Sequence, residues 1–113
     1  MEINSYWDEY PSAVTICDTH GNIVYMNHKA QLTFEKWGGK KLAGQSLYNC
    51  HTEKSSAKIR EILATGIPNT YTIEKDGVKK LIHQSPWYQN GQIAGLVEIS
   101  IVLPNEMPHF VRS

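Results

Sequence analysis

The segment AVTICDTHGNIVYMN, residues 13–27, restricts the fold of this chain more than any other part of it. Its two ends, residues 13–17 and 23–26, are rich in β-branched and other β-prone side chains, which favour strands. Between them, the carboxylate of Asp18 can accept hydrogen bonds from the local backbone, and Gly21 can adopt a positive φ. The segment therefore predicts two short antiparallel strands joined by a tight turn.

Two helices are predicted in the middle of the chain. Asn27 is a good N-cap, and the helix that follows it would bury apolar residues at helical spacing, namely Ala30, Phe34 and Trp37. Gly38 and Gly39 are expected to end this helix. Thr52 can cap a second helix that ends at Gly66, and the buried stripe of this helix would consist of Ile59, Ile62 and Leu63.

Three further strands are predicted at residues 70–75, 79–85 and 92–102. The turns between them contain Asp-Gly and Asn-Gly pairs, which are typical of β-hairpins. Two strands, a helical middle and three more strands predict an α+β fold, in which short helices pack on one face of a five-stranded antiparallel sheet. We expect a single domain over residues 13–103, a cap over residues 1–12 and a tail over residues 104–113.

Four motifs along the chain keep the order and spacing of a known family. The first is the set formed by Asp18, Gly21, Ile23 and Asn27. The others are GGKKLAGQSLYN before the second helix, ATG at its end and NGQIAGLVEISI in the last strand. Together they resemble a PAS domain, the small sensor module of bacterial signalling proteins. The resemblance implies the PAS fold and a sensory module that binds and relays a signal.

The resemblance departs from the family at its end. The usual Asp-Ile-Thr linker is replaced here by Val102-Leu103-Pro104, and no effector domain follows within this chain. We therefore expect a stand-alone sensor protein, for which a separate effector protein is a candidate partner.

By the resemblance, a ligand pocket would lie between the concave face of the sheet and the helices. Strand alternation places Ala13, Thr15 and Cys17 on one face of the first strand. In the last strand, alternation groups five residues that the resemblance assigns to this inner face: Ile93, Gly95, Val97, Ile99 and Ile101. The candidate pocket residues are Thr15, Cys17, Asn27, Cys50, His51, Ile59, Val97 and Ile99. The expected ligand is small and apolar or amphipathic.

The opposite face of the last strand would carry Ala94, Leu96, Glu98 and Ser100, with Leu81, His83 and Ser85 beside them. By the resemblance, such an outer face commonly serves dimers or partner helices. The candidate interface residues are Tyr6, Trp7, Tyr10, Leu81, His83 and Leu96. They support an alternative function, in which side chains fill the pocket and homodimerisation is the role of the domain.

The chain matches the cofactor motifs of the family poorly. In the flavin-binding branch, the position of the reactive cysteine falls on Leu47 and that of the flavin-contacting glutamine falls on Val97. This argues against a flavin site. The axial histidine of the haem-binding branch falls on Ser55, so the resemblance does not support haem either. His51 lies one helical turn before Ser55 and is the remaining candidate for a haem ligand.

The adjacent residues Cys50 and His51 leave two interpretations open. A thiolate and an imidazole can both ligate zinc or iron, and with His83 they would form a small metal protein or enzyme. Alternatively, Cys50 packs and His51 caps or hydrogen-bonds locally, because adjacent side chains rarely point at one ion. The sequence has no nucleophile beside a base, no paired carboxylates and no phosphate-binding loop, so we expect that the protein is not an enzyme.

Charge and cysteine usage narrow the expected partners and location. Eleven basic and eleven acidic residues give a formal net charge of zero, and no long run of like charge is present. This argues against nucleic acid or an anionic membrane as the main partner. No apolar run is long enough to span a bilayer, and the polar N-terminus is unlike a secretory signal. Two cysteines are too few for a disulfide framework, which fits a cytoplasmic protein.

Overall fold

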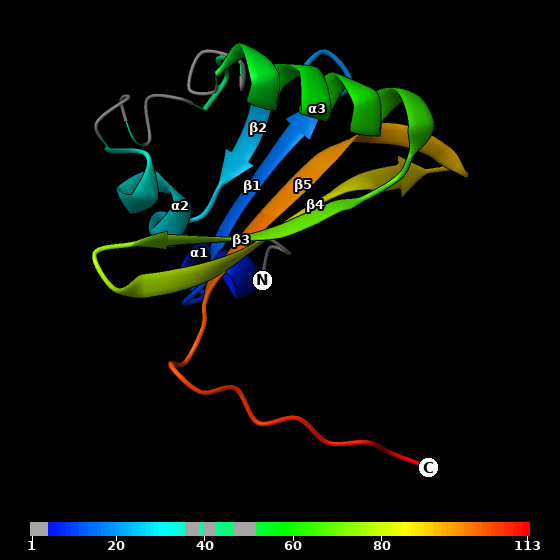
Figure 1. The fold of residues 1–113 in the computed structure, drawn as a ribbon. Coiled ribbons are helices and arrows are strands. Elements are labelled where there is room, and N and C mark those ends of the chain that lie inside the picture. The colour runs from blue at the N-terminus through cyan, green and yellow to red at the C-terminus, as the bar shows by residue number, and fades with distance from the viewer. Residues whose placement is uncertain (1–4, 36–38, 40–42, 47–51) are drawn as a thin grey trace.

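The computed structural model describes residues 5–35, 39, 43–46 and 52–113 of the chain. Its centre is a five-stranded antiparallel sheet with the strand order β2-β1-β5-β4-β3 (Figure 1). The strands are β1 (Ala13–Asp18), β2 (Ile23–Met26), β3 (Asn69–Lys75), β4 (Val78–Gln89) and β5 (Gln92–Val102). The helices are α1 (Ser5–Asp8), α2 (His28–Thr33) and α3 (Glu53–Thr65). The predicted α+β class with a five-stranded antiparallel sheet is confirmed.

The two faces of the sheet are covered differently (Figure 1). Helices α2 and α3 lie over one face, here called the helix face, whose central residues include Thr15, Ile82 and Leu96. Helix α1 lies against the opposite, outer face, where the hydroxyl of Tyr25 donates a 2.7 Å hydrogen bond to Asp8. The N-terminal segment is therefore attached to the sheet on the side away from α3.

The turn between β1 and β2 has the predicted chemistry. One carboxylate oxygen of Asp18 accepts hydrogen bonds from the backbone N–H groups of His20 and Asn22, each 2.9 Å long. Burial acts to raise the pKa of the Asp18 carboxyl, but these hydrogen bonds outweigh it and hold the pKa below its ordinary value. Gly21 adopts the expected positive φ of 82°.

Helix α3 begins and ends where the sequence predicts. The Thr52 hydroxyl accepts a hydrogen bond from the backbone of Ser55, and Gly66 ends the helix in the left-handed conformation. Ile59 and Ile62 are fully buried. They belong to a core cluster that also contains Ala13, Cys17, Ile23, Met26, Ala30 and Leu96. This helix therefore closes one part of the helix face, over the middle of β1 and β5.

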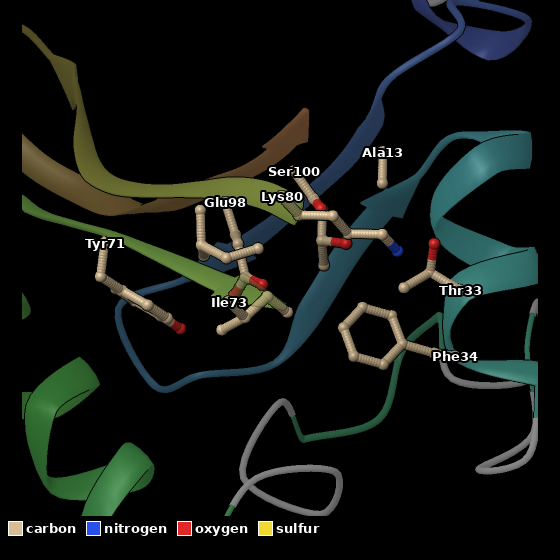
Figure 2. Close-up of a pocket in the computed structure, with 10 residues that line it drawn as sticks. Ala13, Thr33, Phe34, Tyr71, Ile73, Lys80, Glu98 and Ser100 are labelled. Carbon is tan, nitrogen blue, oxygen red and sulfur yellow. The ribbon is translucent and has the colours of Figure 1, made fainter. Parts of the chain in front are cut away.

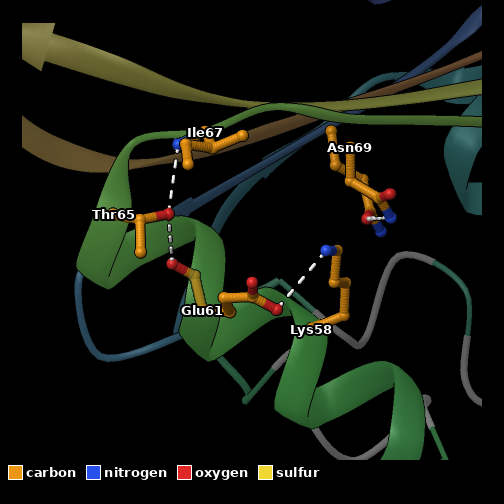
Figure 3. A network of polar contacts seen from close by, with 6 residues as sticks. Lys58, Glu61, Thr65, Ile67 and Asn69 are labelled. Carbon is orange, nitrogen blue, oxygen red and sulfur yellow. Dashed lines mark hydrogen bonds and ion pairs between the residues drawn. The ribbon is translucent and has the colours of Figure 1, made fainter.

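The chain turns from α3 into β3 through a local hydrogen-bond pair (Figure 3). The Thr65 hydroxyl donates to the carbonyl of Glu61 at 2.8 Å and accepts from the backbone of Ile67 at 3.2 Å. The Thr65 side chain thus bonds back onto its own helix and onto the start of the connection that returns the chain to the sheet. This connection brings Asn69, the first residue of β3, over the edge of the helix face.

Two elements differ in length from the prediction. Helix α2 is capped at its C-terminus by Phe34, and the predicted helical residue Trp37 lies outside the described residues. Strand β4 is longer than predicted and continues through Pro86 to Gln89. A proline is tolerated there because β3 pairs with β4 only as far as Gln84, so the missing N–H faces an open edge.

The predicted inner face of β5 is wrong beyond Ile93, and a β-bulge is the reason. Trp87 pairs with Gly95 but Tyr88 pairs with Ile93, so Ala94 is an extra residue in β5. One extra residue reverses the strict alternation of side chains. Ile93 does face the helices, whereas the later residues on the helix face are Leu96, Glu98 and Ser100.

Because of the same bulge, the predicted outer face of β5 is also wrong. Val97, Ile99 and Ile101 lie on it, where Leu81 pairs with Ile101 and His83 pairs with Ile99. Leu96, predicted as an outward interface residue beside Leu81 and His83, is instead 1% exposed within the core. The predicted grouping of Val97 and Ile99 with Thr15 is likewise wrong, because Thr15 pairs with Glu98.

Candidate functional site

Side chains on the helix face form rows that run across the strands. One row joins Thr15 of β1, Glu98 of β5, Gln84 of β4 and Asn69 of β3. The next row consists of Ala13, Ser100, Ile82 and Tyr71, and beyond it Lys80 lies opposite Ile73. Helix α3 packs over the row that precedes these, which contains Cys17 and Leu96. These three rows therefore lie beyond the part of the sheet that α3 closes.

A cavity of about 220 Å³ occupies this part of the helix face, between the sheet and the end of α2 (Figure 2). Residues from β1, β3, β4, β5 and α2 line it. They are Ala13, Thr15, Thr33, Phe34, Tyr71, Ile73, Lys80, Ile82, Glu98 and Ser100. Such a volume lies below the range of about 300–1,000 Å³ typical of pockets for drug-sized ligands. The cavity therefore fits only a small molecule.

A chain of amide hydrogen bonds positions the carboxylate at one end of the cavity. Asn69 Nδ2 donates to Gln84 Oε1 at 3.1 Å, and Gln84 Nε2 donates to Glu98 Oε2 at 3.2 Å. Gln84 is 3% exposed, so its side chain is enclosed by protein. Figure 3 shows the side chain of Asn69 with its hydrogen bond as a dashed line. The Glu98 carboxylate is thus oriented before any ligand arrives.

The phenol of Tyr71 lies near the carboxylate of Glu98. Burial raises the pKa of Tyr71, and the negative charge of Glu98 raises it further. Tyr71 therefore stays protonated at neutral pH, and its hydroxyl can both donate and accept a hydrogen bond. With the hydroxyl of Thr15, which is opposite Glu98 in the sheet, this end of the cavity is rich in hydrogen-bonding groups.

The other end of the cavity is basic and its middle is apolar. Figure 2 shows the ammonium group of Lys80 directed toward Thr33 of α2 and away from the carboxylate of Glu98. Between the two charged groups, Ile82 and Phe34 contribute apolar walls. The cavity can therefore hold an apolar body and offer opposite charges at its two ends.

Asn27 lies beside this cavity but does not line it. Its side-chain oxygen accepts hydrogen bonds from the backbone of Val14 and Ala30, both 3.0 Å long, and its amide donates to the carbonyl of Ser12 at 2.8 Å. The same amide also contacts the carbonyl of Tyr10 at 3.5 Å. The predicted pocket residue Asn27 therefore joins the N-terminal segment, β1 and α2.

The N-terminal segment makes a second contact with the sheet, between Asp8 and Tyr25. It also carries exposed aromatic side chains. Burial and then the hydrogen bond to Asp8 raise the pKa of Tyr25 to about 12, so this phenol keeps its proton. Trp7 and Tyr10 make an edge-to-face contact with ring centroids 5.4 Å apart. Tyr6, Trp7 and Tyr10 are all exposed. Their role as interface residues stays a prediction.

Among the predicted pocket residues that the structure describes, only Thr15 lies in the cavity wall. Cys17 and Ile59 lie in the core cluster, where burial is the main cause that raises the pKa of the Cys17 thiol to about 11. Cys50 and His51 lie outside the described residues. Within residues 5–35, 39, 43–46 and 52–113, no group of three potential metal-binding side chains occurs.

The sequence prediction missed the charged and phenolic residues of the cavity, Glu98, Lys80 and Tyr71. One signal for Glu98 was present, because Gly95 stands inside an otherwise β-prone run. A glycine in a strand often marks a bulge, and a bulge there turns Glu98 toward the helices.

A five-stranded antiparallel sheet that holds a small cavity under flanking helices is an α+β domain architecture. The family model described as the PAS fold matches residues 7–105, so the chain belongs to the PAS family. No curated protein sequence matches this chain. PAS domains are in general sensory, non-catalytic modules, and they occur in histidine kinases and receptors.

Solved structures share this fold at low sequence identity. A PAS domain from Colwellia psychrerythraea is 19% identical, with a TM-score of 0.67 over 88% of this chain and 92% of that one. A sensory box sensor histidine kinase from Vibrio cholerae is 15% identical, with a TM-score of 0.64 over 90% of each chain. VqmA bound to DPO is 18% identical, with a TM-score of 0.64, and the match covers 88% of this chain but only 56% of VqmA.

Proposed function

We propose that this protein is a sensory module that binds a small molecule in the cavity between the sheet and α2. The observation that carries the proposal is the cavity of about 220 Å³, with an oriented carboxylate and a phenol at one end. The binding of DPO by VqmA, a protein of similar fold, supports a small-molecule ligand. A ligand would act only by binding one arrangement of the domain more tightly than another.

Asn27 offers a route from the cavity to the N-terminal segment. Helix α2 contributes Thr33 to the cavity wall, and Asn27 caps this helix while holding the carbonyl of Ser12. A ligand that shifts α2 would therefore strain the hydrogen bonds of Asn27. We propose that the N-terminal segment changes its packing on the outer face as the output of sensing.

Filling the cavity tests the ligand-binding role. In Ser100→Phe, the new ring would occupy the cavity, whereas in the control Ser85→Phe it would lie on the outer face. We expect phenol, used as a small probe, to raise the melting temperature of the wild type and of Ser85→Phe by several degrees. At a concentration tenfold above the dissociation constant, binding stabilises by about 1.4 kcal/mol. Differential scanning calorimetry that shows no shift in the wild type, or an equal shift in Ser100→Phe, would contradict the proposal.

A second candidate function is homodimerisation through the outer face. The observation in its favour is the apolar stripe that Val97, Ile99 and Ile101 of β5 form on this face, where Ile101 is 38% exposed. Leu81 and His83 lie beside them on β4, and the exposed Trp7 belongs to the N-terminal segment. These residues are the surface on which a second copy would pack.

An Ile101→Glu substitution tests this interface. We expect it to weaken dimerisation by at least about tenfold, equivalent to roughly 1.4 kcal/mol, because a carboxylate would be buried between the two copies. Val24→Glu on β2 is the control, since Val24 is also exposed but lies far from β4. Sedimentation velocity at micromolar concentration gives the measurement. A wild type that stays monomeric, or equal effects of both variants, would rule out this interface.

We further propose a cytoplasmic protein whose effector is a separate protein. The formal net charge of zero supports a protein partner over nucleic acid or an anionic membrane. The description of VqmA as a DNA-binding receptor applies to that protein, of which the match covers about half. No helix in the described part of this chain is long and apolar enough to cross a bilayer.

A further inference from the structure

One buried hydroxyl of the cavity wall has no partner in the described part of the chain. Thr15 lines the cavity and is only 4% exposed, yet its hydroxyl makes no hydrogen bond with a described residue. No fully enclosed side-chain oxygen or nitrogen of the described residues is left unpaired. The Thr15 hydroxyl therefore opens into the cavity. Because a buried polar group without a partner is costly, a ligand that hydrogen-bonds to Thr15 gains from doing so.

A neutral oxygen is the ligand group that suits this end of the cavity. The neighbouring carboxylate of Glu98 accepts a hydrogen bond from Gln84 and has a further interaction, so Thr15 is the group left for a ligand here. None of the described lining residues at this end is a cation. A carbonyl or hydroxyl oxygen can accept from the Thr15 hydroxyl without placing a second negative charge beside Glu98.

The basic end is suited to an anion. Lys80 is the one cation among the described residues that line the cavity, and it is half-buried. It forms no ion pair with a carboxylate in the described part of the chain. Its ammonium group is directed toward Thr33 (Figure 2), whose hydroxyl already donates to the carbonyl of Lys29 at 2.9 Å. A carboxylate at this end would supply the missing opposite charge.

A further hydroxyl lies between the two ends. Ser100 pairs with Ile82, two residues from Lys80 along β4, so Ser100 and Lys80 are diagonal neighbours on the helix face. Across β1, Ser100 pairs with Ala13, two residues before Thr15. At about 3.4 Å per residue, Ser100 and Thr15 lie in rows roughly 7 Å apart along the strands. A carboxylate held by Lys80 and Ser100 is therefore separated from Thr15 by the length of a short carbon chain.

We propose that the cavity binds a short carboxylic acid with a second, neutral oxygen a few carbons away, as in 4-oxo and 4-hydroxy acids. The carboxylate contacts Lys80 and Ser100, the neutral oxygen hydrogen-bonds to Thr15, and the carbon chain lies against Ile82. This proposal rests on the proposed function, because it names the ligand class of the same cavity. A plain carboxylic acid leaves Thr15 without a partner, and a neutral ketone leaves Lys80 without an anion.

Isothermal titration calorimetry with matched compounds tests the ligand class. The probes are 4-oxopentanoate and 4-hydroxypentanoate. The controls are 4-oxopentanamide, which has no charge, 4-methylpentanoate, in which a methyl group replaces the neutral oxygen, and 2-oxopentanoate, in which the two polar groups are adjacent. We expect at least one probe to bind about tenfold more tightly than the amide and about fivefold more tightly than the other two controls. Equal or tighter binding of any control would overturn the assignment.

Two variants test which residue contacts which group. Lys80→Met should weaken 4-oxopentanoate binding about tenfold and leave 4-oxopentanamide unchanged. Lys79→Met is its control, because Lys79 removes the same charge but is exposed and, as the adjacent strand residue, faces the other side of the sheet. Thr15→Val keeps the side-chain shape and should weaken 4-oxopentanoate about fivefold but not 4-methylpentanoate.

Circular dichroism shows whether each variant folds. If Thr15→Val does not fold, the comparison of Lys80→Met with Lys79→Met decides by itself. Equal effects of the two lysine variants on 4-oxopentanoate binding would overturn the assignment.

The phenol experiment separates failure of this inference from failure of the proposed function. If phenol binds and Ser100→Phe abolishes its binding, while neither probe acid binds, the ligand class is wrong and the cavity is still a binding site. If neither phenol nor the probe acids bind the wild type, both the ligand class and the ligand-binding function are overturned.

Discussion

Replacement of Gly95 by alanine is expected to destabilise the domain by about 3–5 kcal/mol, or to prevent folding at ordinary temperatures. A Cβ at this position would overlap the carbonyl oxygen of Cys17 and lie 2.5 Å from Trp87 Nε1. Neither group can move away easily, because Trp87 Nε1 donates a 3.0 Å hydrogen bond to that carbonyl. The φ of 157° at Gly95 adds backbone strain for any other residue.

Gly91→Ala is the matched control for this substitution. Gly91 also has a positive φ, of 78°, but a Cβ there would have no neighbour within 4 Å. The control should cost only about 1–2 kcal/mol, the penalty of a left-handed conformation without a clash. Urea denaturation followed by far-ultraviolet circular dichroism measures both variants. Equal losses at the two positions would show that the contact of Gly95 with Cys17 and Trp87 does not matter.

Elements governed by contacts between near neighbours in the sequence could be predicted. The hairpin turn depends on Asp18, which binds backbone groups two and four residues away. The ends of α3 depend on Thr52 and Gly66, whose partners lie within four residues. In both cases the residue type carries the required donor, acceptor or conformational freedom. The sequence therefore predicted these elements almost to the residue.

Strand alternation alone could not show which side chains of β5 face the helices. That choice is set by a β-bulge, and the bulge is associated with a contact across the sheet. The bulge gives the indole of Trp87 a path over Gly95 to Cys17, which is 70 residues away in the sequence. Val97, Ile99 and Ile101 form an apolar stripe that imitates a buried face. Only the glycine within the strand signalled otherwise, and a single glycine does not show which side becomes buried.

The cavity itself depends on where the helices stop. Its charged and phenolic residues come from three different strands, as Glu98 of β5, Lys80 of β4 and Tyr71 of β3. They are brought together only by the strand order and register, which local patterns do not specify. Helix α2 ends at Thr33 and is capped by Phe34, sooner than its apolar spacing predicted. The side chain of Phe34 forms a wall of the cavity at this point.

Asn27 is the residue whose loss should disturb the most separate elements at once. It is 0% exposed, and its side chain meets the backbone of β1, α2 and the N-terminal segment through Val14, Ala30 and Ser12. Removal of the side chain would leave two buried N–H groups and one carbonyl without these partners. A buried polar group that loses its partner costs about 1–3 kcal/mol. No shorter or apolar side chain can replace the donor and acceptor of the amide together.

We therefore expect Asn27→Ala to lower the free energy of unfolding by roughly 3–5 kcal/mol. Thr52→Ala is the matched control, because Thr52 is also an N-cap but is exposed and binds only its own helix, and its loss should cost about 1 kcal/mol. Hydrogen exchange measured by NMR adds a local readout. The amides of Val14 and Ala30 should exchange faster in Asn27→Asp as well, although the carboxylate keeps both acceptors, because the donor to Ser12 is lost and a charge is buried. If Asn27→Ala and Thr52→Ala cost the same, Asn27 acts only as a helix cap and cannot couple the cavity wall to the N-terminal segment.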